Sequence, residues 1–93
     1  MEFEWDEDKR ESNLDKHGID FQDAVHVFDG RVILTGRSTF ELEERFLTTS
    51  ILNDGRCATV IWTVRGEKTR IISARRARDA EERNYRKLYL GRN

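Results

Sequence analysis

The feature that most constrains the fold is an alternating segment at residues 57–64, CATVIWTV, which directly follows the turn sequence NDGR. Every second residue from Ala58 to Val64 is apolar, so one face of a strand is suited to burial. The Asp-Gly pair in NDGR favours the positive φ angles of a type I′ turn. Together the two signals predict an antiparallel hairpin, whose first strand we expect over residues 45–52.

Two more strands are predicted to extend this hairpin into a sheet. Residues 69–74 are rich in β-branched side chains and follow a turn at residues 65–68. A short strand is expected over residues 32–35. The sequence thus predicts a four-stranded antiparallel meander.

Two helices are predicted before the strands and one after them. Asp6 and Asp20 are favourable N-cap residues for helices over residues 7–16 and 21–28. The second helix has apolar residues at i, i+3, i+4 and i+7, which form one stripe. The last helix, over about residues 76–90, is highly charged. The order α-α-β-β-β-β-α predicts an α+β fold whose helices cover one face of the sheet.

Arginines gather on the last two predicted strands, but their register is open. If the loop after Arg65 has two residues, Arg70 pairs with Thr63 and shares a face with Arg65. If the loop has three residues, Ser73 and Arg75 join Arg65 instead. Either register places at least two arginines beside Thr63 on the less apolar face.

The net charge of −1 conceals an uneven distribution. Residues 1–30 carry three basic and ten acidic side chains, whereas residues 65–93 carry ten basic and four acidic ones. A basic segment of this kind indicates a polyanionic partner such as nucleic acid. The alternative is that the two ends of the chain pair with each other in the fold.

Length and composition narrow the class of protein. The 93 residues predict a single domain over residues 1–93. No apolar run approaches the twenty or so residues of a membrane span. The acidic N-terminus does not resemble a signal peptide, and the single cysteine, Cys57, fits a reducing compartment. We therefore expect a cytoplasmic protein.

Three stretches act as motifs: FEWDEDKRESNLDKHGIDFQDAVHVF at residues 3–28, EERF at residues 43–46 and RGEKTRIISARRA at residues 65–77. In this order and spacing they resemble the motifs of the BrnT family, toxins of bacterial type II toxin–antitoxin modules. The resemblance implies a RelE-like fold and a ribonuclease that needs no metal or other cofactor and inhibits translation. It also implies a BrnA-type antitoxin with a ribbon-helix-helix-type DNA-binding part, which neutralises the toxin and binds operator DNA with it.

Metal-independent RNA cleavage uses the 2′-hydroxyl of the substrate as nucleophile. The protein must help remove that proton, neutralise charge on the phosphate and protonate the leaving 5′-oxygen. Arginine suits the second task, because its planar guanidinium binds phosphate bidentately and stays charged. Given the resemblance, we expect Arg65 at the scissile phosphate, with Arg70 or Arg75 beside it according to the register. The proton carriers are expected among His17, Glu44, Lys16 and Tyr85.

Several of these residues also have a purely structural interpretation. Glu44 can form a cross-strand ion pair, and His17 can stabilise the end of a helix that stops at Gly18. Arg76 can point into water from the first turn of the last helix. Besides the catalytic candidates Arg65, Glu44, Arg75 and His17, further RNA contacts are expected from Arg70, Arg45, Lys16, Arg76 and Tyr85.

A second class of function stays open. The chain can be a non-catalytic nucleic-acid-binding module that acts only with its antitoxin as a co-repressor. The two functions differ in one feature, because a ribonuclease needs a proton carrier on the face that holds the arginines. The charged last helix has few apolar contacts, so we expect the antitoxin to cover it or the basic face nearby.

Overall fold

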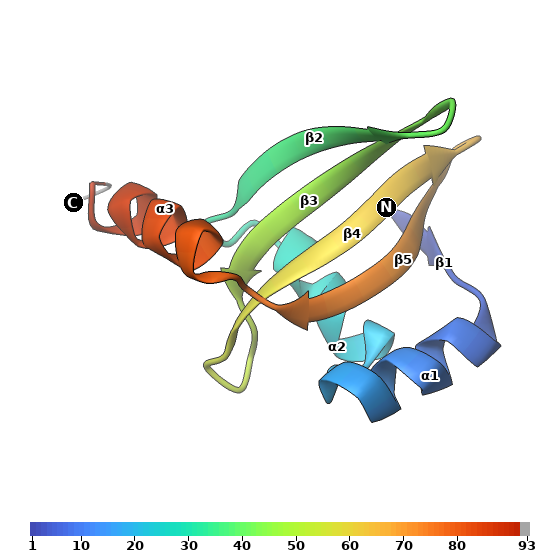
Figure 1. Ribbon diagram of the computed structural model, residues 1–93, viewed down its shortest axis with the longest axis horizontal. Coiled ribbons are helices and arrows are strands. Elements are labelled where there is room, and N and C mark those ends of the chain that lie inside the picture. Colours follow the sequence, from blue (N-terminus) through green and yellow to red (C-terminus); the bar gives the residue numbers. More distant parts are fainter. Residues whose placement is uncertain (92–93) are drawn as a thin grey trace.

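A five-stranded sheet with the order β1-β5-β4-β3-β2 forms the centre of the molecule (Figure 1). The computed structural model describes residues 1–91, so the last two residues of the domain expected over residues 1–93 lie outside the described part. In chain order the elements are β1 (Glu2–Glu4), α1 (Glu7–His17), α2 (Phe21–Ala24), the 3₁₀ helix η1 (Val25–Phe28), β2 (Leu34–Phe40), β3 (Glu43–Ile51), β4 (Cys57–Arg65), β5 (Lys68–Arg76) and α3 (Asp79–Leu90).

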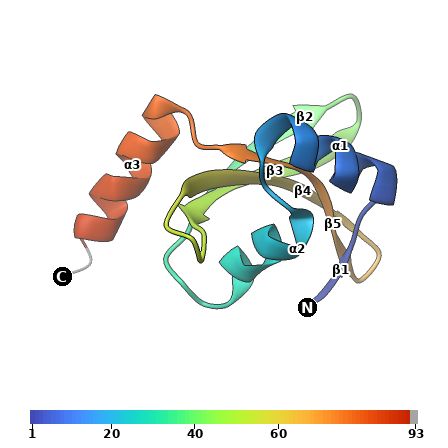
Figure 2. The same ribbon diagram turned by 90° about the horizontal axis from the view of Figure 1, so that it is seen from below.

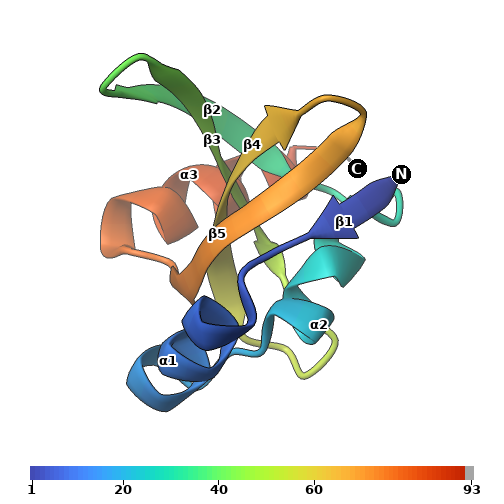
Figure 3. The ribbon, with the colours of Figure 1, turned by 90° about the vertical axis from the view of Figure 1, so that its right-hand side faces the viewer.

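The expectation of a four-stranded, wholly antiparallel sheet is wrong. β2 to β5 do form an antiparallel meander, but β1 adds a fifth strand that runs parallel to β5 (Figure 3). Glu2 lies opposite Lys68, and Glu4 lies opposite Arg70. Three residues are too few for a detectable alternation. The pairing partner is also distant in sequence, so only the complete fold defines this strand.

The two helix starts predicted from their capping residues are confirmed. The Asp6 carboxylate accepts hydrogen bonds from the backbone N–H groups of Asp8 and Lys9 at the start of α1. Asp20 does the same for Gln22 at the start of α2. Gly18 ends α1 with a φ of 70°, the left-handed conformation that glycine adopts without strain.

The expectation that all helices cover one face of the sheet is also wrong. α2 and α3 lie on opposite sides of the sheet (Figure 2). α2 and η1 bury Phe21, Ala24 and Val27 in a core that includes Val60 and Ile71 from the sheet. This core lies on one face only, and the opposite face, partly covered by α3, is called the open face below.

α1 lies along the edge of β5 and is held there mainly by a polar contact. Asn13 is only 7% exposed. Its side-chain amide donates to the carbonyl oxygens of Ala74 (2.8 Å) and Ile19 (3.0 Å), and its Oδ1 accepts from the Ala74 N–H at 3.2 Å. The side chain therefore continues the pairing of β5 beyond the short strand β1.

The turn between β3 and β4 differs from the expected type I′ turn. The Leu52 N–H donates to the Arg56 carbonyl at 2.8 Å, so three residues form the loop, and Gly55 alone within it has a positive φ, 91°. The Gly55 N–H donates to the Leu52 carbonyl. This is the pattern of a three-residue hairpin loop that ends in a left-handed glycine.

Candidate functional site

The register of β4 and β5 decides which arginines reach the open face. Arg65 pairs with Lys68 and Thr63 pairs with Arg70, so the hairpin has a two-residue turn. Thr59, Ile61, Thr63 and Arg65 alternate with the core residues of β4. Arg70 therefore lies on the open face beside Thr63.

A β-bulge brings a further arginine to the same face. Ile61 pairs with Ser73, whereas the adjacent Trp62 pairs with Ile71, so Ile72 has no partner on β4. One extra residue reverses the inward and outward alternation of the bulged strand. Ser73 and Arg75 consequently share the open face with Arg70. The two registers predicted as alternatives are both realised, one on each side of the bulge.

Arg75 is fixed by a carboxylate of α3. Its Nη1 and Nη2 atoms lie 2.7 and 3.1 Å from Oε1 and Oε2 of Glu81. Glu81 also accepts from the Thr59 hydroxyl at 3.0 Å and from the Arg78 N–H at 2.8 Å. The guanidinium of Arg75 is the main cause that lowers the pKa of Glu81 to about 2. Glu81 was not predicted as a site residue, although an acidic residue in the first turn of a helix is a recognisable signal.

Glu43 organises the other end of the open face. Its carboxylate accepts from Arg45 Nε at 3.1 Å and pairs with Arg65 Nη2 at 3.5 Å. The hydrogen bond from Arg45 is the main reason that the pKa of Glu43 is lowered. Arg70 in turn pairs with Glu4 of β1 at 2.7 Å. Four guanidinium groups on this face thus share three carboxylates.

Glu44, the carboxylate predicted as a general base, points to the other side of the sheet. Its ion pair there is with Arg37, at 3.9 Å. A strand reverses its side chains at every residue, so the adjacent Glu43 occupies the position beside Arg65. The structure places Arg45, Arg65, Arg70 and Arg75 on one face of the sheet, with Arg45 and Arg65 at one end and Arg75 at the other, whereas Glu44 lies on the opposite face.

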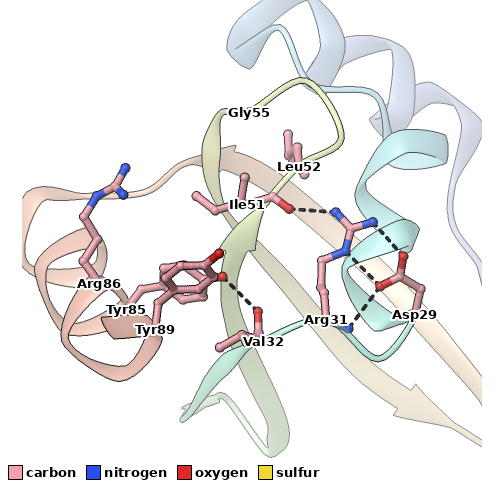
Figure 4. A pocket seen from close by; sticks show the side chains of 9 residues that line it. All are labelled: Asp29, Arg31, Val32, Ile51, Leu52, Gly55, Tyr85, Arg86 and Tyr89. Carbon is pink, nitrogen blue, oxygen red and sulfur yellow. Dashed lines mark hydrogen bonds and ion pairs between the residues drawn. The ribbon is translucent and has the colours of Figure 1, made fainter. Parts of the chain in front are cut away.

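Arg76 and Tyr85 are also not grouped with the four arginines of the open face. Arg76 is the last residue of β5 and pairs with Ala58 of the core face, so the expectation that it begins the last helix is wrong. Tyr85 is buried, and its hydroxyl donates to the Val32 carbonyl at 3.0 Å. Tyr85 and Tyr89 line a hollow of about 600 Å³, which Arg31 also lines (Figure 4). That guanidinium is already bound by Asp29 and the Ile51 carbonyl.

His17 and Lys16 lie at the end of α1, next to the edge of β5. They line a shallow hollow of about 180 Å³ together with Ser73 and Ile72. Since Ser73 belongs to the open face, the end of α1 borders that face across the bulge. These two predicted residues therefore lie next to the open face but do not contact its arginines in this hollow.

Two hollows mark the open face itself. One, of about 370 Å³, lies between α3 and the sheet and is lined by residues that include Leu47, Thr49 and Glu81. The other, of about 440 Å³, lies at the tip of the β2–β3 hairpin and is lined by residues that include Arg45 and Arg65. Leu47 and Ile61 lie opposite each other between these two ends.

Within residues 1–91, no three His, Cys, Asp or Glu side chains are grouped so that they could hold a metal ion. None of the helices in that part of the chain has the length and apolar character needed to cross a membrane.

Comparison with known proteins identifies related chains. Residues 5–81 match the family model described as the ribonuclease toxin BrnT of type II toxin–antitoxin systems. The fold is similar to the 1.1 Å crystal structure of the Brucella abortus ribonuclease toxin BrnT, with a TM-score of 0.65 and 30% sequence identity over 85% of this chain and 99% of that chain. No curated protein sequence matches.

Proposed function

The chain belongs to the BrnT family, the ribonuclease toxins of type II toxin–antitoxin systems, and from this we propose that its open face binds and cleaves RNA without a metal ion. The 2′-hydroxyl attacks the adjacent phosphorus, a 2′,3′-cyclic phosphate forms, and the 5′-oxygen leaves with a proton. By cutting RNA the toxin inhibits translation in the cytoplasm. Membership of this class of toxin implies an RNA substrate and an antitoxin partner.

The observation that carries this proposal is the placement of Arg45, Arg65, Arg70 and Arg75 on one face through the register and the bulge. Arginines spaced along three strands of one face can contact successive phosphates of a bound RNA strand. Arginines distributed over several faces would support neither RNA binding nor RNA cleavage at one site. Of the three arginines in residues 70–76, Arg70 and Arg75 lie on this face and Arg76 does not.

Arg65 is best suited to the scissile phosphate. Its side chain is 56% exposed, and its ion pair with Glu43 is the longest on the open face, at 3.5 Å. An exposed pair of this kind contributes only about 0–1 kcal/mol, so an RNA phosphate can replace the carboxylate at little cost. Arg75 is held more firmly, by two hydrogen bonds to Glu81. It contributes positive charge to the open face without being free to move toward a phosphate.

The two carboxylates Glu43 and Glu81 serve to orient arginines rather than to carry protons. Glu81 has a pKa of about 2 and is therefore a weak base at neutral pH, so its role is to orient Arg75. Glu43 orients Arg45 and Arg65 in the same way. His17 remains the candidate general acid, because the hollow that it lines reaches Ser73 on the open face.

A cleavage assay with two matched arginine variants tests the proposed function. Arg65 and Arg37 each pair with a glutamate of β3, but on opposite faces of the sheet. Purified protein is incubated with total RNA in EDTA. We expect Arg65→Ala to lower the cleavage rate roughly a hundredfold, as for loss of one donor to a developing charge, and Arg37→Ala to retain it. Equal activity in both variants would remove Arg65 from the site.

The antitoxin is proposed to be of the BrnA type, with a ribbon-helix-helix-type DNA-binding part, and to cover α3 and the nearby open face. α3 exposes Leu88, Tyr89 and Leu90 around its last turn, and a partner that encloses the end of the helix can bury them. Replacing Leu88 by Asp is expected to weaken antitoxin binding while the free toxin still cleaves RNA. A toxin that becomes inactive as well would show that Leu88 serves the fold rather than the interface.

One observation favours a second candidate function. Glu43 and Glu81, two of the three carboxylates that touch the arginines of the open face, have lowered pKa values, so neither of these two exchanges protons readily at neutral pH. A non-catalytic module that binds operator DNA together with its antitoxin needs no proton carrier. RNA binding without cleavage by the wild-type protein in EDTA, with repression of the operon by the complex, would favour this function.

A further inference from the structure

The β2–β3 hairpin extends away from α1 and α2 (Figures 1 and 3). An aromatic residue, Phe40, is exposed near its tip. Phe40, the last residue of β2, pairs with Glu43 in the antiparallel register, so its ring lies on the same face as Glu43 and Arg45. The residue is 54% exposed and is not part of the core. Phe40 itself has no role in the function proposed above.

The cations of the open face hold the ring of Phe40 in place. The Cζ atom of Arg45 lies over the ring, 4.4 Å from its centroid, which is within the range of a cation–π contact. Glu43 binds Arg45 Nε at 3.1 Å and Arg65 Nη2 at 3.5 Å. One carboxylate therefore positions both the guanidinium that supports the ring and the guanidinium proposed to hold phosphate.

The hollow beside the ring has room for a ligand. It measures about 440 Å³ and is lined by Phe40, Glu43, Arg45, Arg65 and the two turn residues. Proteins that hold single-stranded nucleic acid combine cations that follow the backbone with aromatic rings on which bases stack. Phe40 and Arg65 supply both elements within one hollow.

From this geometry we infer that Phe40 is a stacking platform for one nucleobase of single-stranded RNA, next to the phosphate held by Arg65. This inference rests on the proposed function, because the phosphate must lie on the open face for a neighbouring base to reach the ring. Stacking accepts any base, so Phe40 contributes affinity and position rather than recognition of a particular sequence. The guanidinium behind the ring fixes its orientation before RNA arrives.

A binding experiment with an uncleavable probe tests the role of the ring. The probe is a short fluorescent single-stranded 2′-O-methyl RNA, which lacks the nucleophilic hydroxyl, together with copies that carry one abasic nucleotide at each position in turn. Anisotropy titrations compare the wild type with Phe40→Leu, which keeps apolar volume, and Phe40→Trp, which keeps a ring. Val64→Thr is the matched control, because Val64 is an apolar residue as exposed as Phe40 but lies outside the hollow, next to Arg65 on β4 and therefore on the other face of the sheet.

We expect Phe40→Leu to weaken binding of the intact probe about tenfold, and Phe40→Trp and Val64→Thr to retain the wild-type affinity. For the wild type, an abasic nucleotide at one position of the probe should lower the affinity by a similar factor. In Phe40→Leu the same abasic probe should bind no more weakly than the intact probe, because the stacking platform is already lost.

Three other results would overturn the inference. Wild-type affinity in Phe40→Leu would show that no base stacks on the ring, while the proposed RNA binding would still stand. Equal losses in Phe40→Leu and Val64→Thr would indicate a general effect of losing an exposed apolar side chain rather than stacking on the ring. A wild type that does not bind the probe would contradict the proposed function itself, and the stacking platform with it.

Discussion

At the residue scale, Asn13 shows how one polar side chain can hold a helix. α1 has a single aliphatic side chain, Leu14, and that residue is exposed. Asn13 instead pairs with both backbone groups of Ala74, continuing the pairing of β5 where β1 ends. Its third contact, to the Ile19 carbonyl, fixes the turn that leads into α2.

Replacing Asn13 by Ala is expected to lower the free energy of unfolding by about 2–4 kcal/mol, since buried backbone groups lose their partners and a cavity remains. Urea denaturation followed by circular dichroism measures this change. Asn84→Ala, at an exposed position of α3, is the control and should change stability by less than about 0.5 kcal/mol. Similar losses in the two variants would mean that α1 is held by other contacts.

The face of the sheet on which a site residue lies could be predicted only where the alternation of side chains along its strand was predicted correctly. Arg65 was expected to share a face with either Arg70 or Arg75, and the bulge at Ile72 places both of them there. Glu44 is one residue away from the position beside Arg65, and one residue is enough to reverse a side chain in a strand. Glu81 belongs to a helix whose docking on the open face depends on tertiary contacts, so no local pattern connected it with Arg75.

At the element scale, α3 is attached to the sheet by few contacts, and Glu81 provides the strongest of them. The carboxylate joins the first turn of α3 to Arg75 of β5 and Thr59 of β4. Because its pKa in the folded protein, about 2, is below its ordinary value of 4.5, the charged form stabilises the fold. This stabilisation is complete above about pH 5 and is lost as the pH falls toward 2.

Glu81→Gln is expected to be less stable than the wild type by about 1–2 kcal/mol at neutral pH, after solvent screening of the ion pair. The difference should shrink as the pH falls from about 5 to 2, and urea titrations at several pH values measure it. Glu82→Gln removes only a 3.7 Å surface pair with Arg86 and should have little effect at neutral pH. A gap between wild type and Glu81→Gln that does not depend on pH would contradict this role.

The helix caps and the longer strands were predictable because each depends on neighbouring residues. Asp6, Asp20 and Gly18 act through groups within a few positions of themselves. The bulge at Ile72 and the side of the sheet that α3 covers depend instead on pairing and packing across the whole chain. Those two features nevertheless decide where Arg75 lies and what it contacts.

At the scale of the whole molecule, the uneven charge is only slightly cancelled by contact between the two ends of the chain. Among the ion pairs within residues 1–91, Glu4–Arg70 is the one that joins the first thirty residues to the basic C-terminal segment. Most acidic side chains near the N-terminus pair locally or face solvent. The basic segment therefore keeps much of its charge for a partner.

The net charge of −1 makes general attraction between the molecule and RNA weak, so the cations of the open face must supply the affinity. Each phosphate neutralised on a single strand contributes about −0.7 to the slope of log K against log salt. Arg65→Ala should therefore make this slope shallower by about 0.7, whereas Arg37→Ala, on the other side of the sheet, should leave it unchanged. Anisotropy titrations of an uncleavable single-stranded RNA at several salt concentrations measure the slopes. Since both variants lose one positive charge, they differ only in where the charge was, and equal slopes would mean that RNA does not lie along the open face.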